Sequence, residues 1–401
     1  MGFIFTLILF AATLVLSEVL KPKPRIENAR PASLGDFQFP TATEDRVIPL
    51  IWGTVRLNSP NVIWYGDLRQ RAITEKVKTG LFSSKSVTKG FRYNIGVQMA
   101  LCRGGGDSPL AEQPELLRVF VDDEEVFSGS QGEGVINIDR PDLFGGDDRG
   151  NGGISGDLSV RVGTEDQTIP TYLEAFQPVP GLPGRFVHYR GTMFVTWEGG
   201  YIGNSTNVAP WNFEVRRIPN GLGLGTPTVN GGNDLNPMNA IFEIMTNDEW
   251  GLGFPAADID TAAFTAAATT LLAEGNGLSF IWDSEREVSE ILREIERQID
   301  GVVFLDRSTG KWTVTLARGG YDIDAVPQVT DPIEIRDFTR GAWEDTTNFI
   351  QVRFSHRGRE YQGTFAPAID HGNIFIQGGT VKQSILDYSM VKDPSLANSI
   401  L

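Results

Sequence analysis

Short apolar or alternating runs, each closed by Gly, Pro, Asn or Asp, recur along this chain and limit its fold more than any other feature. Such runs are typical of β-strands bounded by turns. The 401 residues include 45 Gly and 22 Pro, about one residue in six against a usual share of about 12%. A β-rich fold is therefore predicted, with strands at residues 47–57, 61–65, 91–102, 192–198, 211–218, 312–316 and 350–354.

The first two runs, 47–57 and 61–65, are separated by one short turn that contains Ser-Pro. Neighbouring runs joined by a short turn usually form a hairpin, so these two are expected to pair. Near the other end of the chain, strands are also expected at about 361–365 and 374–376. Sheet structure is thus predicted at both ends of the folded part.

A tight hairpin is predicted over residues 118–127, and its turn is acidic. The chain must reverse at four carboxylates, which are Asp122, Asp123, Glu124 and Glu125. A calcium loop would need a regular D-x-D-x-D-G spacing, which is missing. A solvated turn is the favoured interpretation.

Helical patterns appear only after the glycine-rich segment 220–225, which is interpreted as a linker because no phosphate-loop Lys-Ser/Thr follows it. Asn236 and Pro237 suit the start of one helix. Asp260 suits the cap of an alanine-rich helix that ends near Gly275. Together with the strands, these helices indicate an α+β architecture.

A third helix is predicted over residues 284–299, where Ser284 and Glu287 match a capping box. Its apolar residues repeat at helical spacing, and its glutamates lie off that stripe. A catalytic carboxylate pair needs a cleft and separated pKa values, so a solvated face is the favoured interpretation of Glu285, Glu290, Glu294 and Glu296.

The net charge is −16 and the sequence pI is about 4.7. Because nucleic-acid recognition depends on clustered Lys and Arg, sequence-specific binding is not expected. An acidic surface repels the phosphate backbone, so it would suit a channel through which DNA passes without binding.

Few residues are available for disulfide, metal or nucleophile chemistry. The single cysteine, Cys102, excludes an intrachain disulfide and a cysteine metal cage, and its strand-like context suggests a small buried apolar residue. His188, His356 and His371 show neither HxH nor HExxH spacing, which argues against a zinc enzyme. No catalytic residue, cofactor or metal is therefore assigned.

Two tryptophans, Trp52 and Trp64, could be suspected of forming a sugar-binding platform. Both lie in otherwise apolar runs, so they are expected to belong to the core.

Residues 3–16 form an uncharged apolar run that precedes a Pro-rich, polar segment, 21–46, predicted as an extended arm. The run is slightly short of the roughly 20 residues that span a bilayer, and it lacks the basic start and cleavage site of a signal peptide. A signal or anchor stays open beside a helix buried against its copies in an assembly, since an all-round apolar helix must be covered. The residues assigned to this possible membrane or lumen helix are Phe3, Ile4, Phe5, Leu7, Ile8, Leu9, Phe10, Leu14, Val15 and Leu16.

Several segments, in order, resemble the hub region of siphophage tail-tip proteins, the family of the lambda host-specificity protein and the gene-transfer-agent large tail protein. The resemblance covers about residues 30–400. The segments that carry it are RVIPLIWGTVRLNSPNVIWYGDL at 46–68, VHYRGTMFVTWE at 187–198, NFEVRRIPN at 212–220, NPMNAIFEIMTNDEWGLG at 236–253, TTNFIQVRFSHRGREY at 346–361 and NIFIQGGTVKQSILDY at 373–388.

This resemblance implies a β-rich α+β, multi-domain tail hub with two β-barrel-like domains, an inserted β domain, a small α/β domain and the N-terminal hydrophobic helix. Three copies would form a ring with pseudo-sixfold symmetry that docks on the sixfold tail tube, because duplicated domains adapt threefold to sixfold symmetry. The implied ranges are 1–46 for the helix and arm, 47–103 with 179–218 for tube-docking hub domain I, 104–178 for the insertion, 219–323 for hub domain II and 324–401 for hub domain III.

The implied location is the virion, at the distal end of the tail. The implied partners are further copies of the chain, the tail tube or distal tail protein, other tail-tip and fibre proteins, the tape measure protein, DNA that passes without specific binding, and possibly the host membrane through the N-terminal helix. Relatives usually continue toward receptor-binding modules, whereas this sequence stops soon after a helix expected to begin near Asp393 and Pro394. Receptor binding is therefore not assigned.

Two other functions are kept open beside the structural, non-enzymatic one. The first is a tail-associated cell-wall hydrolase or glycan-binding protein, which would need paired carboxylates about 5 to 9.5 Å apart or a metal site. The second is a membrane-anchored envelope protein led by residues 1–20.

Overall fold

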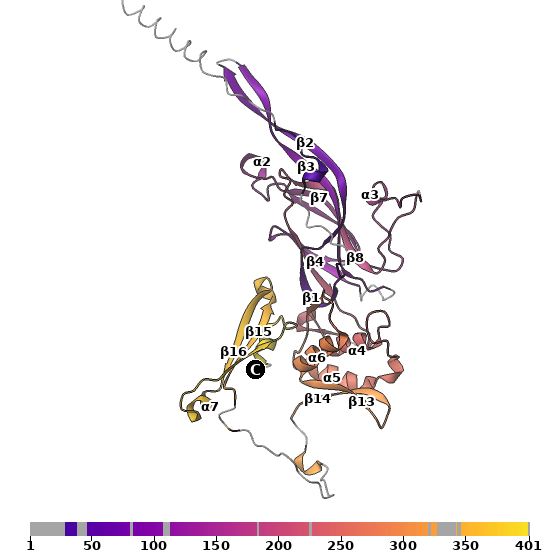
Figure 1. Ribbon diagram of the computed structural model, residues 1–401, viewed down its shortest axis with the longest axis vertical. Coiled ribbons are helices and arrows are strands. Elements are labelled where there is room, and N and C mark those ends of the chain that lie inside the picture. The colour runs from indigo at the N-terminus through magenta and orange to yellow at the C-terminus, as the bar shows by residue number, and fades with distance from the viewer. Residues whose placement is uncertain are drawn as a thin grey trace, which may run out of the picture.

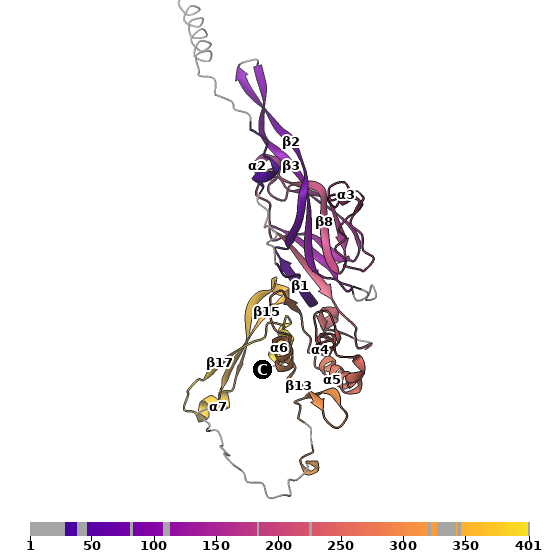
Figure 2. The ribbon, with the colours of Figure 1, turned by 45° about the vertical axis from the view of Figure 1, so that its right-hand side comes forward.

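The computed structural model describes residues 29–37, 46–80, 83–106, 113–182, 184–223, 227–319, 322–326, 342 and 346–399. The molecule is elongated (Figure 1). A unit of two β-sheets occupies its upper part, and a helical region and a C-terminal sheet lie side by side below it, as Figure 2 also shows. The fold is β-rich with several antiparallel sheets, as the turn-bounded runs of the sequence predict.

The upper unit contains two five-stranded antiparallel sheets. The first has the strand order β12 (Phe280–Trp282), β1 (Leu50–Asn58), β9 (Trp211–Arg217), β4 (Glu115–Val121) and β5 (Glu124–Gln131). The second has the order β2 (Asn61–Gly80), β3 (Ser83–Arg103), β8 (Thr192–Gly203), β7 (Ile154–Arg161) and β6 (Gly134–Arg140). Both orders are linear, so within the described residues these are open sheets and not the closed barrels that the family resemblance implied.

One large hydrophobic core fills the space between these two sheets. Both contribute fully buried side chains to it, such as Phe213 from the first sheet and Trp197 from the second. Strands from the predicted hub domain I and from the predicted insertion share this core, and the division into domains stays a prediction.

The predicted pairing of the first two strands is wrong. β1 pairs with β9 and β12, whereas β2 pairs with β3. The turn between them contains Ser59 with a left-handed φ of 51°, and it carries the chain from one sheet to the other. A short turn thus forms a corner between two sheets here and not a hairpin.

β2 and β3 form a hairpin that extends well beyond the rest of their sheet (Figure 1). Pairing of β3 with β8 begins only at Tyr93, so the part of the hairpin beyond Tyr93 has two strands. Residues 29–37 run beside it, since Ala29 N donates to Thr88 O at 3.1 Å and Gln70 Nε2 donates to Ala32 O at 2.6 Å.

The helical region contains α4 (Pro237–Thr246), α5 (Thr261–Ala273) and α6 (Val288–Ile299), packed with the hairpin of β13 (Gly301–Asp306) and β14 (Lys311–Leu316). Two predicted caps are confirmed, because Asn236 accepts from Met238 N and Asp260 accepts from Ala263 N. The predicted capping box of the third helix is wrong: α6 begins four residues later than Ser284, and its N-cap Glu287 makes no side-chain cap hydrogen bond.

The C-terminal sheet has the order β16 (Gln362–Ile369), β15 (Phe349–His356) and β17 (Gln383–Asp387). α8 (Pro394–Ser399) covers one of its faces. A strand was expected at 374–376, but these residues end the short helix α7 (His371–Ile376), whose N-cap Asp370 accepts from Asn373 N. The cap overrides the strand-like apolar sequence.

Shorter elements connect these parts. They are the 3₁₀ helices at Leu34–Asp36, Asn230–Gly232, Ala256–Asp258, Ile323–Ala325 and Arg357–Arg359, the helices α2 (Gly146–Arg149) and α3 (Thr171–Glu174), and the strands β10 (Thr228–Val229) and β11 (Asp234–Leu235). No helix in the described ranges has the length and apolar character needed to cross a bilayer.

Candidate assembly surfaces

The predicted N-terminal helix residues, from Phe3 to Leu16, lie outside the described residues, so that assignment stays a prediction. The acidic hairpin turn is described. Asp122 and Asp123 occupy it with left-handed φ values of 54° and 63°, and both are exposed. Over the described ranges, no group of three or more His, Cys, Asp or Glu is placed to hold a metal ion.

Cys102 is fully buried in the core of the two-sheet unit. Burial raises the pKa of its thiol to about 12, so the thiolate is scarce at neutral pH. The interpretation of Cys102 as a buried apolar residue is confirmed.

The tryptophans differ in burial. Trp52 is fully buried, and its indole donates to Glu243 at 2.7 Å, which confirms a core position. Trp64 is half-buried and packs against Tyr172 and Phe176. It lies at the edge of the core.

The glutamates of α6 are engaged in local contacts. Arg286 lies 2.9 Å from Glu294 and 3.6 Å from Glu290, and Glu296 accepts from Val303 N at 2.7 Å. The Glu294 side chain is only 15% exposed, so the predicted solvated face is too simple at that position. These contacts fix the helix against neighbouring segments.

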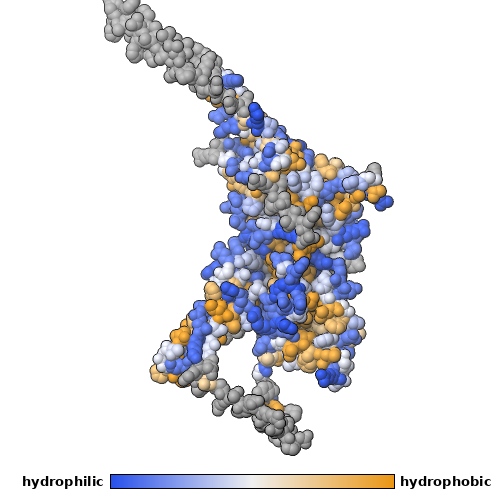
Figure 3. Space-filling view, in the orientation of Figure 1, coloured by the Kyte–Doolittle hydropathy of each residue, from blue (hydrophilic) through white to orange (hydrophobic). Residues whose placement is uncertain are grey.

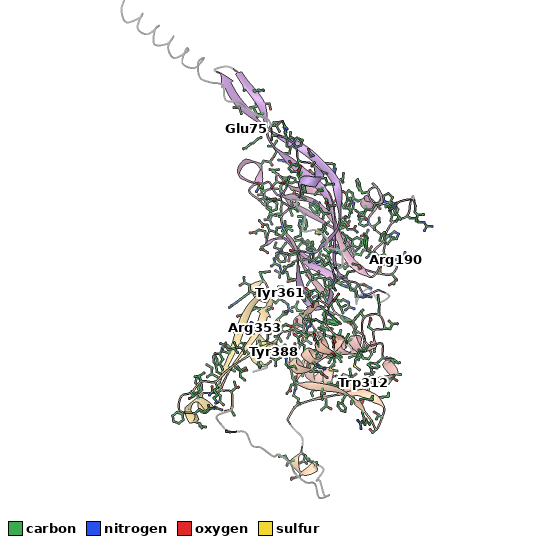
Figure 4. All side chains as sticks on the ribbon, in the orientation of Figure 1. Glu75, Arg190, Trp312, Arg353, Tyr361 and Tyr388 are labelled. Atoms are coloured by element: carbon green, nitrogen blue, oxygen red, sulfur yellow. The ribbon has the colours of Figure 1, made fainter. Side chains whose placement is uncertain are left out.

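The most connected polar cluster of the described structure joins the C-terminal sheet to the two-sheet unit. Arg118 on β4 makes a bidentate pair with Glu214 on β9, at 2.6 and 3.0 Å. Tyr361, in the turn between β15 and β16, donates to the same Glu214 at 2.9 Å. Figure 4 shows Tyr361 where the C-terminal sheet approaches the upper unit. We call these residues, with Arg56 and Glu360, the junction network.

Arg56 and Glu360 complete the junction network. Glu360 accepts from Arg56 at 3.1 Å and from Arg118 at 3.2 Å. The two guanidinium groups also lie 4.2 and 4.9 Å from the centroid of the Phe120 ring, within the range of cation–π attraction. The turn residues Glu360 and Tyr361 reach these partners with left-handed φ values of 50° and 60°.

Two pKa values in the junction network are raised, each for a different main reason. The hydrogen bonds to Glu214 raise the pKa of Arg118 above its already high value. Burial, followed by the neighbouring Glu214 charge, raises the pKa of Tyr361. The tyrosine therefore stays a neutral hydrogen-bond donor at neutral pH, and the carboxylate remains paired.

A second junction joins the same sheet to the helical region. Arg357 pairs with the buried Asp234 and contacts Ser279 Oγ at 3.0 Å, and Ser279 N donates to Met390 O at 2.9 Å. Lys392 is half-buried nearby and donates to Ser389 O at 2.5 Å. Burial and then the charge of Arg357 lower the pKa of Lys392 to about 8.

A polar cleft of about 860 Å³ lies between the two junctions. Its walls include Arg56, Asp123, Tyr361 and Lys392. Asp123 and Glu360 hold Arg56 in this cleft. Tyr361 donates to Glu214, Ser389 donates to Glu294, and Lys392 donates to Ser389 O. The arrangement is suited to holding two parts of the chain together.

The outer face of the C-terminal sheet exposes apolar side chains on β16 and β17 with polar groups between them, where Arg353 pairs with Asp387 and Gln351 accepts from Gln383. Side chains alternate along the strands, so Val352, Phe354 and Ala366 are buried against α8. The opposite face exposes three large apolar side chains: Phe365 at 50%, Ile369 at 48% and Ile385 at 55%. We call these three residues, with Pro367 beside them, the outer apolar face.

Apolar exposure continues near this sheet and on the neighbouring hairpin. Phe375 and Ile376 of α7 are 86% and 65% exposed, and β13 exposes Val302, Phe304 and Leu305. In Figure 3 apolar residues, in orange, gather on both lower parts of the visible face. Clusters of exposed apolar side chains of this kind mark interaction surfaces.

Sequence reasoning missed the junction network and the outer apolar face. The partners in the network are 242 and 304 residues apart for Arg118–Glu360 and Arg56–Glu360, and no local pattern reports such pairs. The alternation in 349–356 was visible, but it does not tell which face is covered. The short Arg-Gly-Arg-Glu-Tyr segment at 357–361 was the only local signal of a polar turn.

Comparisons with known proteins reveal a similarity to a solved virion structure. No protein-family model and no curated protein sequence matches the chain. Among solved structures, the chain is similar to a chain described as "Virion of native gene transfer agent (GTA) particle", with a TM-score of 0.51 and 15% sequence identity, over 94% of this chain and 74% of that one. At this identity the likeness is one of fold, and it extends over nearly the whole of the present chain.

Proposed function

We propose that this chain is a structural, non-catalytic virion protein, the subunit of a trimeric tail hub. In this role three copies join the sixfold tail tube to threefold components at the tail tip and surround the path by which DNA leaves. The observation that carries the proposal is the fold similarity to a chain of a gene-transfer-agent virion over 94% of the present chain. The sequence segments that resemble tail hubs support it independently.

The surface chemistry supports assembly with further copies. The outer apolar face and the exposed residues of β13 offer apolar area that a monomer in water would leave unfavourably hydrated. A ring of identical copies buries such faces by heterologous contacts whose rotation closes. We assign the outer apolar face to the contact between copies.

The junction network supports the same role in a different way. A hub must transmit force and position between the tube and the tip, so its parts must keep a fixed orientation. Charge-assisted and bidentate hydrogen bonds such as those between Arg118 and Glu214 fix geometry as well as stabilise it. The Tyr361 and Glu360 contacts extend this fixed geometry to the C-terminal sheet.

Light scattering and native mass spectrometry of the purified full chain test the proposal. A trimer of this 44.0 kDa chain is expected, together with no clearing on a cell-wall zymogram. A stable monomer that hydrolyses cell wall would reject both the hub and the non-catalytic role. The variant Phe365→Ser, Ile385→Ser should weaken this trimer, and Val135→Ser serves as its control.

A further inference from the structure

The exposed hairpin of β2 and β3 differs in charge from the rest of the molecule. Residues 69–92 contain seven Lys and Arg residues against one Glu, a net charge of +6 in a chain of −16, which leaves −22 for the remainder. Six of the seven have described side chains, and we call these the basic hairpin: Arg69, Arg71, Lys76, Lys85, Lys89 and Arg92.

The length of the hairpin separates its charge from the acidic remainder. From Tyr93 to Ser83 the two strands run without a third partner strand, a distance of roughly 30 Å at about 3.4 Å per residue. The screening length at physiological salt is about 8 Å. The positive potential near the end of the hairpin therefore acts almost independently of the body.

Three of the six charges on the basic hairpin have an acidic partner within the chain. Arg92 pairs with Asp147, Arg69 lies 3.3 Å from Asp67, and Lys89 lies 3.9 Å from Glu75, the labelled residue on the hairpin in Figure 4. Arg71, Lys76 and Lys85 have no acidic partner among the described residues. The strand register also places Arg71 directly opposite Arg92, and like charges directly opposite are unfavourable. Asp147 relieves this repulsion in part by pairing with Arg92.

A cleft at the base of the hairpin concentrates this charge. It has a volume of about 300 Å³, and Arg71 and Arg92 line it together with Asn94, Ser155 and Tyr201. Planar guanidinium groups bind phosphate oxygens in a bidentate manner. Because Arg92 is held by Asp147 through two of its nitrogens, Arg71 is the cationic group that the cleft offers to a phosphate-bearing ligand, beside the neutral polar groups.

The sequence that precedes the hairpin favours a lipid bilayer as the source of the phosphate groups. Ala29 is hydrogen-bonded to Thr88 of the hairpin. The sequence that precedes it contains three basic residues at positions 21, 23 and 25 and the apolar run 3–16. Membrane-binding proteins combine an apolar segment with a polybasic patch, because neither signal alone gives stable attachment.

We propose that the basic hairpin is an electrostatic docking surface for a bilayer that contains anionic phospholipids. Arg71, Lys76 and Lys85 meet the lipid phosphates and orient the acidic body away from the membrane. This goes beyond the hub proposal and does not depend on the copy number. Lysines on a free hairpin also prevent edge-to-edge pairing, so the experiment must separate the two effects.

The test is binding of the full chain to vesicles of phosphatidylcholine alone and of phosphatidylcholine with 30% phosphatidylglycerol, compared at equal lipid. The variant Arg71→Gln, Lys76→Gln, Lys85→Gln is expected to bind anionic vesicles about 100-fold more weakly, since each basic residue near the surface contributes roughly a fivefold factor. The matched control, Arg190→Gln, Arg307→Gln, Lys311→Gln, removes the same charge from exposed positions elsewhere and should change binding by less than about threefold.

Four results would overturn the proposal. Unchanged binding of the hairpin variant to anionic vesicles would show that the charges do not meet lipid, and self-association of that variant alone would assign the lysines to edge protection. Tighter, hairpin-dependent binding of duplex DNA at the same phosphate concentration would make this a nucleic-acid surface. Loss of the variant from assembled tails with vesicle binding intact would make it a protein-docking surface. If the purified chain is not trimeric, the hub proposal fails while the vesicle result still stands.

Discussion

The two-sheet unit and the C-terminal sheet bury their apolar side chains to different extents. The two-sheet unit encloses 27 buried residues between its sheets, whereas the C-terminal cluster has seven and covers only one face of its sheet. The first unit can therefore hold its structure by itself, whereas the C-terminal sheet depends on the junctions and leaves the outer apolar face for a partner. In the proposed hub, the two-sheet unit provides most of the stability and the C-terminal sheet provides the contact between copies.

The largest difference should appear when equivalent aromatic side chains are removed from the two cores. Phe213→Ala in the two-sheet unit is expected to lower the free energy of unfolding by about 3–5 kcal/mol, because a cavity remains in a closely packed core. Phe354→Ala in the C-terminal sheet should cost less than about 3 kcal/mol and expose mainly that sheet to hydrogen exchange. Denaturant unfolding with hydrogen exchange measures both. Equal and global effects would contradict the contrast.

Glu214→Gln tests whether the C-terminal sheet depends on the junction network. Glu214 is buried, and its loss leaves Arg118 without its bidentate partner, so a cost of about 2–4 kcal/mol is expected. Glu125→Gln is the control, because Glu125 lies 3.4 Å from the same arginine on its exposed side. Thermal unfolding should show a large shift for the first variant and almost none for the second.

Phe365→Ser combined with Ile385→Ser tests the outer apolar face. Association of copies should weaken by about 30-fold or more, the effect of losing residues worth about 2 kcal/mol, while the melting temperature of the protomer stays nearly constant. Val135→Ser, at a residue that is 58% exposed on the two-sheet unit, should leave association unchanged. Equal weakening by both variants would show that apolar exposure in general drives self-association.

The smallest expected effect concerns Lys392 in the cleft between the regions. Its folded pKa is about 8 and its unfolded pKa is about 10.4, so between these values the unfolded chain binds more protons. Stability from this group should rise as the pH increases from about 8 to 10.4, and Lys392→Met should abolish that rise. Unfolding curves of both proteins at several pH values measure this dependence of stability on pH. An identical pH slope in the variant would assign the rise to other groups.

The sequence predicted features that depend on neighbouring residues. The Asn236 and Asp260 caps and the 118–127 hairpin were predicted correctly, because each pattern and its hydrogen bonds lie within a few residues. Residues 374–376 were misassigned, because an apolar tripeptide is compatible with both states until Asp370 caps a helix.

Long-range features could not be predicted in the same way. The pairing of β1 with β9 joins residues about 160 positions apart, and Glu360 meets Arg118 and Arg56 across a still longer stretch of chain. The basic residues of the hairpin are visible in the sequence. That the hairpin extends away from the acidic body, and so separates the two charges, is visible only in the structure.

The position and copy number of this chain in purified tails test the hub proposal most directly. Electron cryomicroscopy of the particles should place three copies in one ring at the distal end of the tail, with the outer apolar face covered by the adjacent copy. Density for the chain elsewhere in the particle, or in a number other than three, would contradict the proposal.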